Sequence, residues 1–131
     1  MTERFAVDTS AVVDLMRAGR RKPPQLSVAE AIYLPIPVLG ELYFGALSTL
    51  RPEHHIALLE NETNGWTPLA PDSVTARVYG EMRAGIRNVL PISNSKLNDL
   101  WIAALCLQHN LPLLTNDRGF DHIAGLTVLH W

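Results

Sequence analysis

The sequence contains one cysteine, so no disulfide bond can form within a single chain. Paired cysteine and histidine ligands of the kind that hold zinc are also missing. Cys106 lies among Ala103, Ala104, Leu105 and Leu107, and this apolar setting predicts a small buried hydrophobic side chain. Stability must therefore come from an ordinary hydrophobic core.

Long apolar segments and a strong charge of either sign are missing as well. No run approaches the roughly 20 apolar residues that span a bilayer, and the first residues lack the apolar segment of a signal peptide. We therefore expect a cytoplasmic protein without a membrane partner. The net charge of -2 argues against a general nucleic-acid coat, which needs a broad positive surface. Any nucleic acid must be held by local basic groups or through metal ions.

Glycine-rich phosphate loops are the third absence. Neither a GxxxxGK[ST] loop nor a GxGxxG turn occurs, so we expect no nucleoside triphosphate or dinucleotide. What the chain does have is apolar residues, at 47% of its 131 residues against 18% charged residues. This composition and length predict a single globular domain over residues 1–131.

Short apolar runs alternate with helical segments along the chain. Strands are expected at residues 5–7, 31–36, 66–69, 111–115 and 126–129, and helices after Ser10 and over residues 37–48, 52–64, 74–86 and 96–110. The alternation predicts a three-layer α/β/α fold with a central, mainly parallel sheet of the flavodoxin-like or Rossmann-like kind. If strands two and three extend one side of strand one, and strands four and five the other, strands one and four are neighbours.

Four acidic residues stand at informative positions in this plan. Asp8 and Asp117 each follow an apolar strand, where parallel sheets bind ligands, and they would face each other across one crevice. Glu41 is the single charge in an apolar helix, which predicts a buried carboxylate with a function; pairing with a distant arginine is the structural alternative. Asp99 begins a helix, where an acid can simply stabilise the helix dipole.

Together these acids indicate a metal site. Four carboxylates in one pocket repel one another and would partly protonate unless a cation neutralised them. Hard oxygen ligands favour Mg²⁺ or Mn²⁺ over zinc. Such an ion can lower the pKa of a bound water and neutralise charge on a phosphate ester, so the set suits phosphodiester hydrolysis by metal-activated water.

Four segments resemble the PIN-domain ribonucleases, specifically VapC-type toxins of toxin–antitoxin pairs. They are residues 7–10 (VDTS), 38–46 (VLGELYFGA), 98–104 (NDLWIAA) and 113–120 (LLTNDRGF). The resemblance implies a metal-dependent endoribonuclease with Asp8, Glu41, Asp99 and Asp117 as its acids, Asp8 and Asp99 being the most direct metal ligands. It also implies a homodimer, a cognate VapB-like antitoxin that occupies the cleft, and structured RNA as substrate.

Supporting roles are expected for two further groups. Hydroxyl and amide side chains that can orient the carboxylates or a bound water are Thr9, Ser10, Thr115 and Asn116. Cations that can contact the RNA backbone are Arg118 and the loop residues Arg20, Arg21 and Lys22.

Two alternatives remain open at this point. A haloacid-dehalogenase-like phosphatase also places an aspartate after its first strand, but it needs a second acid two residues later, where this chain has Ser10. The other alternative is a catalytically idle PIN-like module that binds RNA or a partner through the same cleft.

Overall fold

The computed structural model describes residues 3–86 and 96–131. Its centre is a five-stranded sheet in the order β3-β2-β1-β4-β5, and every pairing is parallel. The strands are β1 (Arg4–Val7), β2 (Ala31–Pro35), β3 (Thr67–Leu69), β4 (Leu113–Leu114) and β5 (Val128–Leu129). In the register, Ala6 of β1 is opposite Tyr33 of β2 and Leu113 of β4. The predicted sheet, with its first and fourth strands adjacent, is confirmed.

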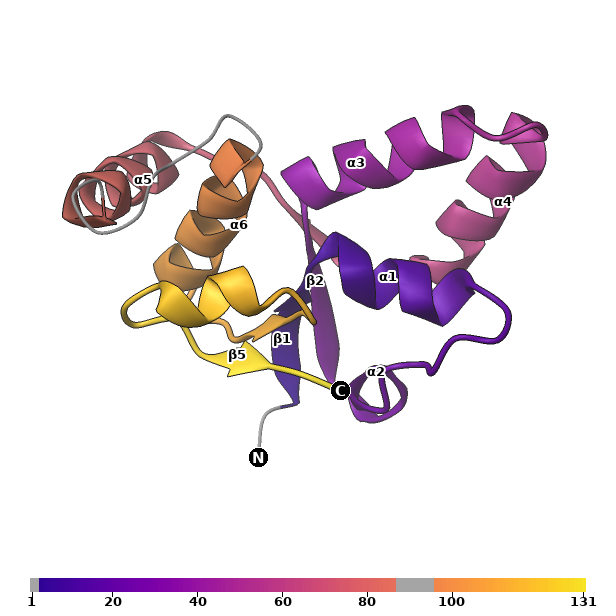
Figure 1. Cartoon of the computed structure of the whole chain (residues 1–131), viewed down its shortest axis with the longest axis horizontal. Coiled ribbons are helices and arrows are strands. Elements are labelled where there is room, and N and C mark those ends of the chain that lie inside the picture. Colours follow the sequence, from indigo (N-terminus) through magenta and orange to yellow (C-terminus); the bar gives the residue numbers. More distant parts are fainter. Residues whose placement is uncertain (1–2, 87–95) are drawn as a thin grey trace.

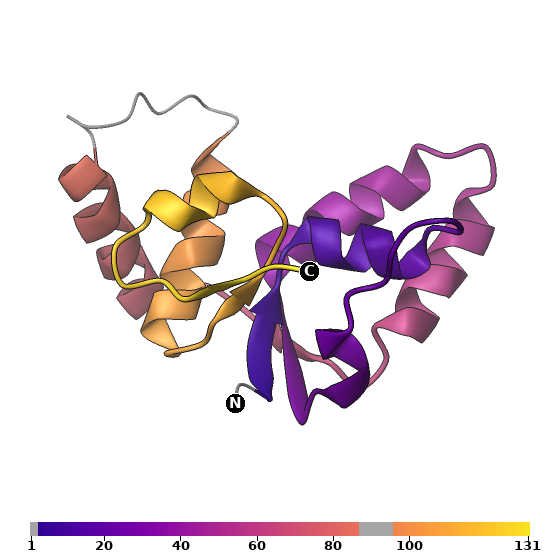
Figure 2. The same cartoon turned by 60° about the horizontal axis from the view of Figure 1, so that its bottom comes forward.

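Helices cover both faces of this sheet (Figures 1 and 2). One face carries α1 (Thr9–Met16), α3 (Ile36–Leu47) and α4 (Pro52–Glu62), and the other carries α5 (Ser73–Ile86) and α6 (Leu97–Gln108). The expected three-layer arrangement is therefore present. A short helix, α2 (Gln25–Val28), was not predicted, and a 3-10 helix, η2 (Arg118–His122), follows β4.

The core lies around β1 and α6. Phe5, Ala6 and Val7 have no exposed surface, as expected for a central parallel strand that is covered on both faces. Residues 102–106 of α6 are equally buried. Cys106 is fully buried, as predicted, and burial together with the nearby charge of Asp8 raises the pKa of its thiol to about 12. No helix in the described ranges combines the length and the apolar character needed to cross a bilayer.

Helix α3 differs from its prediction. Its apolar sequence predicted burial on all sides, yet only Val38, Leu42 and Ala46 are buried. Two of its large side chains on the opposite side, Phe44 and Leu47, are 75% and 59% exposed. The prediction was wrong because α1 and α4 pack against one side of the helix only, and the other apolar side stays at the surface.

Candidate active site

Asp8 leaves the end of β1 and occupies the N-cap position of α1 without making a side-chain capping bond. Its Oδ2 instead accepts a hydrogen bond of 2.8 Å from Thr115 Oγ1, which belongs to the segment after β4. Burial raises the pKa of Asp8; hydrogen bonds from Thr115 and from the Thr9 backbone oppose that effect, and the charges of Glu41 and Asp117 add to it. The Asp8 side chain therefore belongs to the site rather than to the cap of α1.

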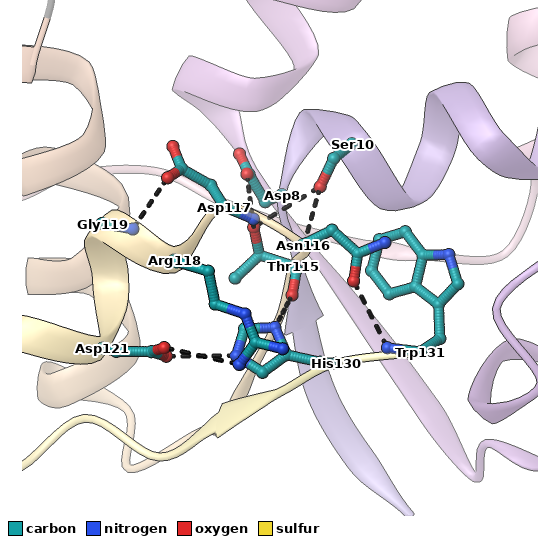
Figure 3. Close-up of polar contacts among 10 residues, drawn as sticks. All are labelled: Asp8, Ser10, Thr115, Asn116, Asp117, Arg118, Gly119, Asp121, His130 and Trp131. Atoms are coloured by element: carbon teal, nitrogen blue, oxygen red, sulfur yellow. Dashed lines mark hydrogen bonds and ion pairs between the residues drawn. The ribbon is translucent and has the colours of Figure 1, made fainter.

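The Thr115 hydroxyl joins the ends of the two central strands (Figure 3). While it donates to Asp8, it accepts a hydrogen bond of 3.0 Å from the backbone N–H of Asp117. Ser10 Oγ lies 3.4 Å from the same hydroxyl and accepts a hydrogen bond of 3.2 Å from the Asn116 backbone. The Asp117 carboxylate accepts a bond of 2.8 Å from the N–H of Gly119. These hydrogen bonds hold Asp8 and Asp117 close to each other across the ends of β1 and β4, as predicted.

Glu41 reaches the site from the half-buried side of α3. Its Oε2 accepts a hydrogen bond of 2.8 Å from Thr9 Oγ1, and its Oε1 accepts one of 3.2 Å from Asn98 Nδ2. Within residues 3–86 and 96–131, no arginine or lysine forms an ion pair with it. Two neutral donors, rather than the distant arginine of the structural alternative, hold this carboxylate in place.

Asp99 lies in the first turn of α6, with 28% of its side chain exposed. Burial raises its pKa to about 6, and the charges of Asp8, Asp117 and Glu41 add to the shift. The Lys96 ammonium, 3.8 Å from Asp99 Oδ2, opposes it. These mutual effects mean that the structure brings all four predicted acids together at the carboxyl end of the sheet.

The donor set is chemically suited to a hard divalent ion. All four groups are carboxylates, and no cysteine or histidine is among them. In the part of the chain that is described, no three acidic, histidine or cysteine side chains already surround one point at ligand distance. Mg²⁺ does not require this, because it is commonly held by one or two carboxylates and keeps several waters. The residues present therefore fit Mg²⁺ or Mn²⁺ with few direct ligands.

The predicted basic contacts lie outside this acid cluster. Arg20 Nε is 2.9 Å from Asp14 Oδ1, and Arg118 forms an ion pair of 3.6 Å with Asp121. The side chain of Arg118 runs toward Asp121 in Figure 3. Arg21 and Lys22 are exposed in the loop after α1. Contact of these four cations with RNA stays a prediction.

Two residues after β5 contact the segment that follows β4 and hold it in place (Figure 3). His130 contacts the Thr115 carbonyl oxygen through Nδ1 and Asp121 Oδ1, at 3.1 Å, through Nε2. Trp131 donates its backbone N–H to Asn116 Oδ1 at 3.3 Å and its indole N–H to Asp14 Oδ2 at 3.1 Å. We call His130 and Trp131 the rear clasp. It engages the Asn116 side chain through the Trp131 backbone. The expected role of Asn116 in orienting a carboxylate or a bound water stays a prediction.

Loss of the rear clasp should therefore weaken both stability and activity. His130→Ala removes the hydrogen-bond partner of the carbonyl of buried Thr115 and loosens the segment that carries Thr115 and Asp117. We expect urea unfolding to show a loss of about 1–2 kcal/mol and any cleavage by the site to fall about tenfold. His122→Ala, at an exposed position, is the matched control. Equal behaviour of the two variants would contradict a role for the clasp.

Sequence reasoning missed Asn98, Lys96 and the rear clasp. Lys96 stands three residues before Asp99, and that spacing on a helix could have signalled the contact. His130 and Trp131 gave no local signal, because Thr115 and Asn116 lie 15 residues earlier and Asp14 lies 117 residues earlier.

A parallel sheet of this order, with four acids gathered beyond its first and fourth strands, is the architecture of a PIN domain. The PIN domain family profile matches residues 5–126, so the chain belongs to that family. Among characterised proteins it is similar to Ribonuclease VapC2 of Haemophilus influenzae, with 25% identity over 98% of both chains. It is also similar to Ribonuclease VapC5 of Mycobacterium tuberculosis, with 27% identity over 91% of this chain and 87% of the relative.

Solved structures agree with this assignment. The VapBC-1 structure from nontypeable Haemophilus influenzae matches with a TM-score of 0.78 and 25% identity, over 98% of both chains. The DNA-bound VapBC structure from Salmonella typhimurium shares the fold, with a TM-score of 0.83 and 24% identity over 100% of this chain and 99% of that one. The predicted PIN-like fold and the resemblance to VapC ribonucleases are confirmed, and the phosphatase alternative loses its basis.

Proposed function

We propose that this domain, over residues 1–131, is a Mg²⁺- or Mn²⁺-dependent endoribonuclease that acts as the toxin of a toxin–antitoxin pair in the cytoplasm. The observation that carries the proposal is the gathering of four carboxylates beyond the first and fourth strands, where Thr115 joins Asp8 to the Asp117 backbone and Lys96 lies within 4.0 Å of both Asp99 and Asp117. Burial and this crowding raise the pKa of Asp99 to about 6. Such crowding of like charges is costly without a cation, and it is typical of a functional site. The ribonuclease names of the VapC relatives supply the substrate class.

The side chains of this domain would share the work as follows. Asp8 and Asp99 would hold the ion directly, with Glu41 and Asp117 completing the negative shell. A bound divalent ion supplies a water of lowered pKa and neutralises charge on the phosphate as the phosphodiester is hydrolysed. Thr115 keeps Asp8 and the Asp117 backbone in register, and Thr9 and Asn98 hold Glu41 so that its charge can orient the attacking water.

Apolar surface beside the site supports the proposed protein partners. Phe44 and Leu47 of α3 and Leu50 just after it are 75%, 59% and 102% exposed, and exposed apolar surface of this kind typically marks an interface. A groove between α1, α3 and α4 is lined by Val13, Met16 and Leu58, among others, and reaches Glu41. We assign these surfaces to a homodimer and to a VapB-like antitoxin, the partner class seen in the VapBC complexes.

Cleavage of RNA tests the proposal. Purified, antitoxin-free protein should cut total cellular RNA into discrete fragments in Mg²⁺ or Mn²⁺, resolved on a denaturing gel. EDTA and the variant Asp99→Asn should each abolish the fragments, because both remove the bound ion. If the RNA stays intact with either metal, while the protein binds RNA, the catalytically idle module is the correct function.

A further inference from the structure

Lys96 is a cation built into the acid cluster. Its Nζ lies 3.8 Å from Asp99 Oδ2 and 3.9 Å from Asp117 Oδ2. In residues 3–86 and 96–131, no other lysine or arginine side chain comes within 4.0 Å of any of the four site acids. The ammonium thus connects the start of α6 to the loop after β4, where charge of the opposite sign is most concentrated.

The backbone around Lys96 leaves room for this contact. A Cβ added to Gly119 would lie 3.0 Å from Asp117 Oδ1 and 3.8 Å from Lys96 Nζ. The bare glycine therefore lets the Asp117 carboxylate fold back onto the Gly119 N–H while its other oxygen faces the ammonium. Because 54% of the Lys96 side chain is exposed, its role is electrostatic rather than part of the core.

Charge balance shows what this ammonium does to the site. The four carboxylates carry up to four negative charges, and Lys96 offsets one of them. One divalent ion then leaves a net charge of about −1, whereas a second would bring it to about +1 and would have to displace the ammonium from Asp99 and Asp117. The other two acids, Asp8 and Glu41, have no cationic neighbour within the described ranges and are bound by hydroxyl and amide donors.

We propose that Lys96 takes the place of a second metal ion, so that each chain binds one divalent cation, held directly by Asp8 and Asp99. The ammonium occupies the side formed by Asp99 Oδ2 and Asp117 Oδ2, and it is the group that offers positive charge to a phosphate there. This inference rests on the proposed metal-dependent function and specifies the stoichiometry of the same site.

Direct counting of Mn²⁺ tests the inference without any RNA. Isothermal titration of the full chain, with free Mn²⁺ followed by electron paramagnetic resonance, should give one ion per chain. Lys96→Met, which keeps the length of the side chain and removes its charge, should either take up a second ion or bind the first about tenfold more tightly. Lys96→Arg should keep the wild-type count. Lys22→Met, in the exposed loop, should leave Mn²⁺ binding unchanged.

The Mn²⁺ counts distinguish failure of the role of Lys96 from failure of the proposed metal-dependent function. Two ions on the wild-type chain would overturn the role of Lys96 and leave the metal-dependent function standing. Unchanged number and affinity in Lys96→Met would also overturn it. If the wild type binds no Mn²⁺, both the role of Lys96 and the metal-dependent function are wrong. Circular dichroism will establish whether Lys96→Met is folded when its bound Mn²⁺ ions are counted. If the Met variant unfolds, the number of ions bound by Lys96→Arg tests the inference instead.

Discussion

Replacing Asp8 by asparagine should reduce the rate of RNA cleavage by more than about a thousandfold, because the site loses the central carboxylate that would hold the ion. The fold should survive, since an asparagine amide oxygen can still accept the hydrogen bond that the Thr115 hydroxyl donates to Asp8 over an O···O distance of 2.8 Å. Burial raises the pKa of Asp8, which shows that the ionised form is unfavourable in the metal-free site. Asp8→Asn should therefore unfold at the same temperature as the wild type or higher in EDTA.

The control for this result is another buried aspartate of α1. Asp14 accepts hydrogen bonds from Arg20 and Trp131 and takes no part in the acid cluster. Asp14→Asn should lower stability by about 1–2 kcal/mol, because it weakens a charge-assisted contact, and should retain cleavage. The two variants thus have opposite expected effects, measured by gel-resolved cleavage and thermal unfolding. Unfolding of Asp8→Asn in metal-free buffer would contradict the division of roles.

The second large effect is a dependence of stability on pH that originates at Asp99. The folded pKa is about 6 against 3.8 for the ordinary carboxyl, so between these values the folded chain holds a proton that the unfolded chain has lost. The stabilising contribution of this proton is full below about pH 4 and disappears as the pH rises through 6. Integrated over the shift, the unfolding free energy of metal-free protein should fall by up to about 3 kcal/mol.

Urea unfolding from pH 4.5 to 8 in EDTA measures this slope. Asp99→Asn should remove most of this slope, leaving the part that Asp8 contributes through its own raised pKa, and should be more stable than the wild type at pH 8. The exposed Glu81→Gln should keep the wild-type slope. Mn²⁺ should oppose the slope in the wild type, because it binds the ionised carboxylates that high pH produces. Parallel profiles for the wild type and Asp99→Asn would rule out Asp99 as the origin.

The sheet could be predicted because each of its strands is marked by a short apolar run in the sequence. Runs such as Phe5 to Val7 are apolar on both sides, as buried parallel strands are, and the order of elements then leaves few topologies. Three of the acids followed from the same plan, since Asp8 and Asp117 come after strands and Asp99 lies in the first turn of a helix. Glu41 was found as the single charge in an apolar helix. The prediction of a metal ion at these acids used only their negative charge and their oxygen ligands.

The remaining features depend on tertiary packing. An apolar helix such as α3 has no sequence mark that tells a buried face from an apolar face left at the surface, so the exposure of Phe44 could not be read in advance. Asn98 looked like part of a helix start, and its amide reaches Glu41 only because α3 and α6 pack together. The rear clasp likewise depends on where β5 places His130.

The hydrogen bond between Thr115 and Asp8 also affects when the site can form during synthesis of the chain. Its two residues are 107 positions apart, so a growing polypeptide carries Asp8 long before it carries Thr115 and Asp117 from the β4 region. Contacts of such long sequence separation form late in folding. During synthesis the emerging chain therefore has no assembled cluster with which to attack RNA, including that of the ribosome making it.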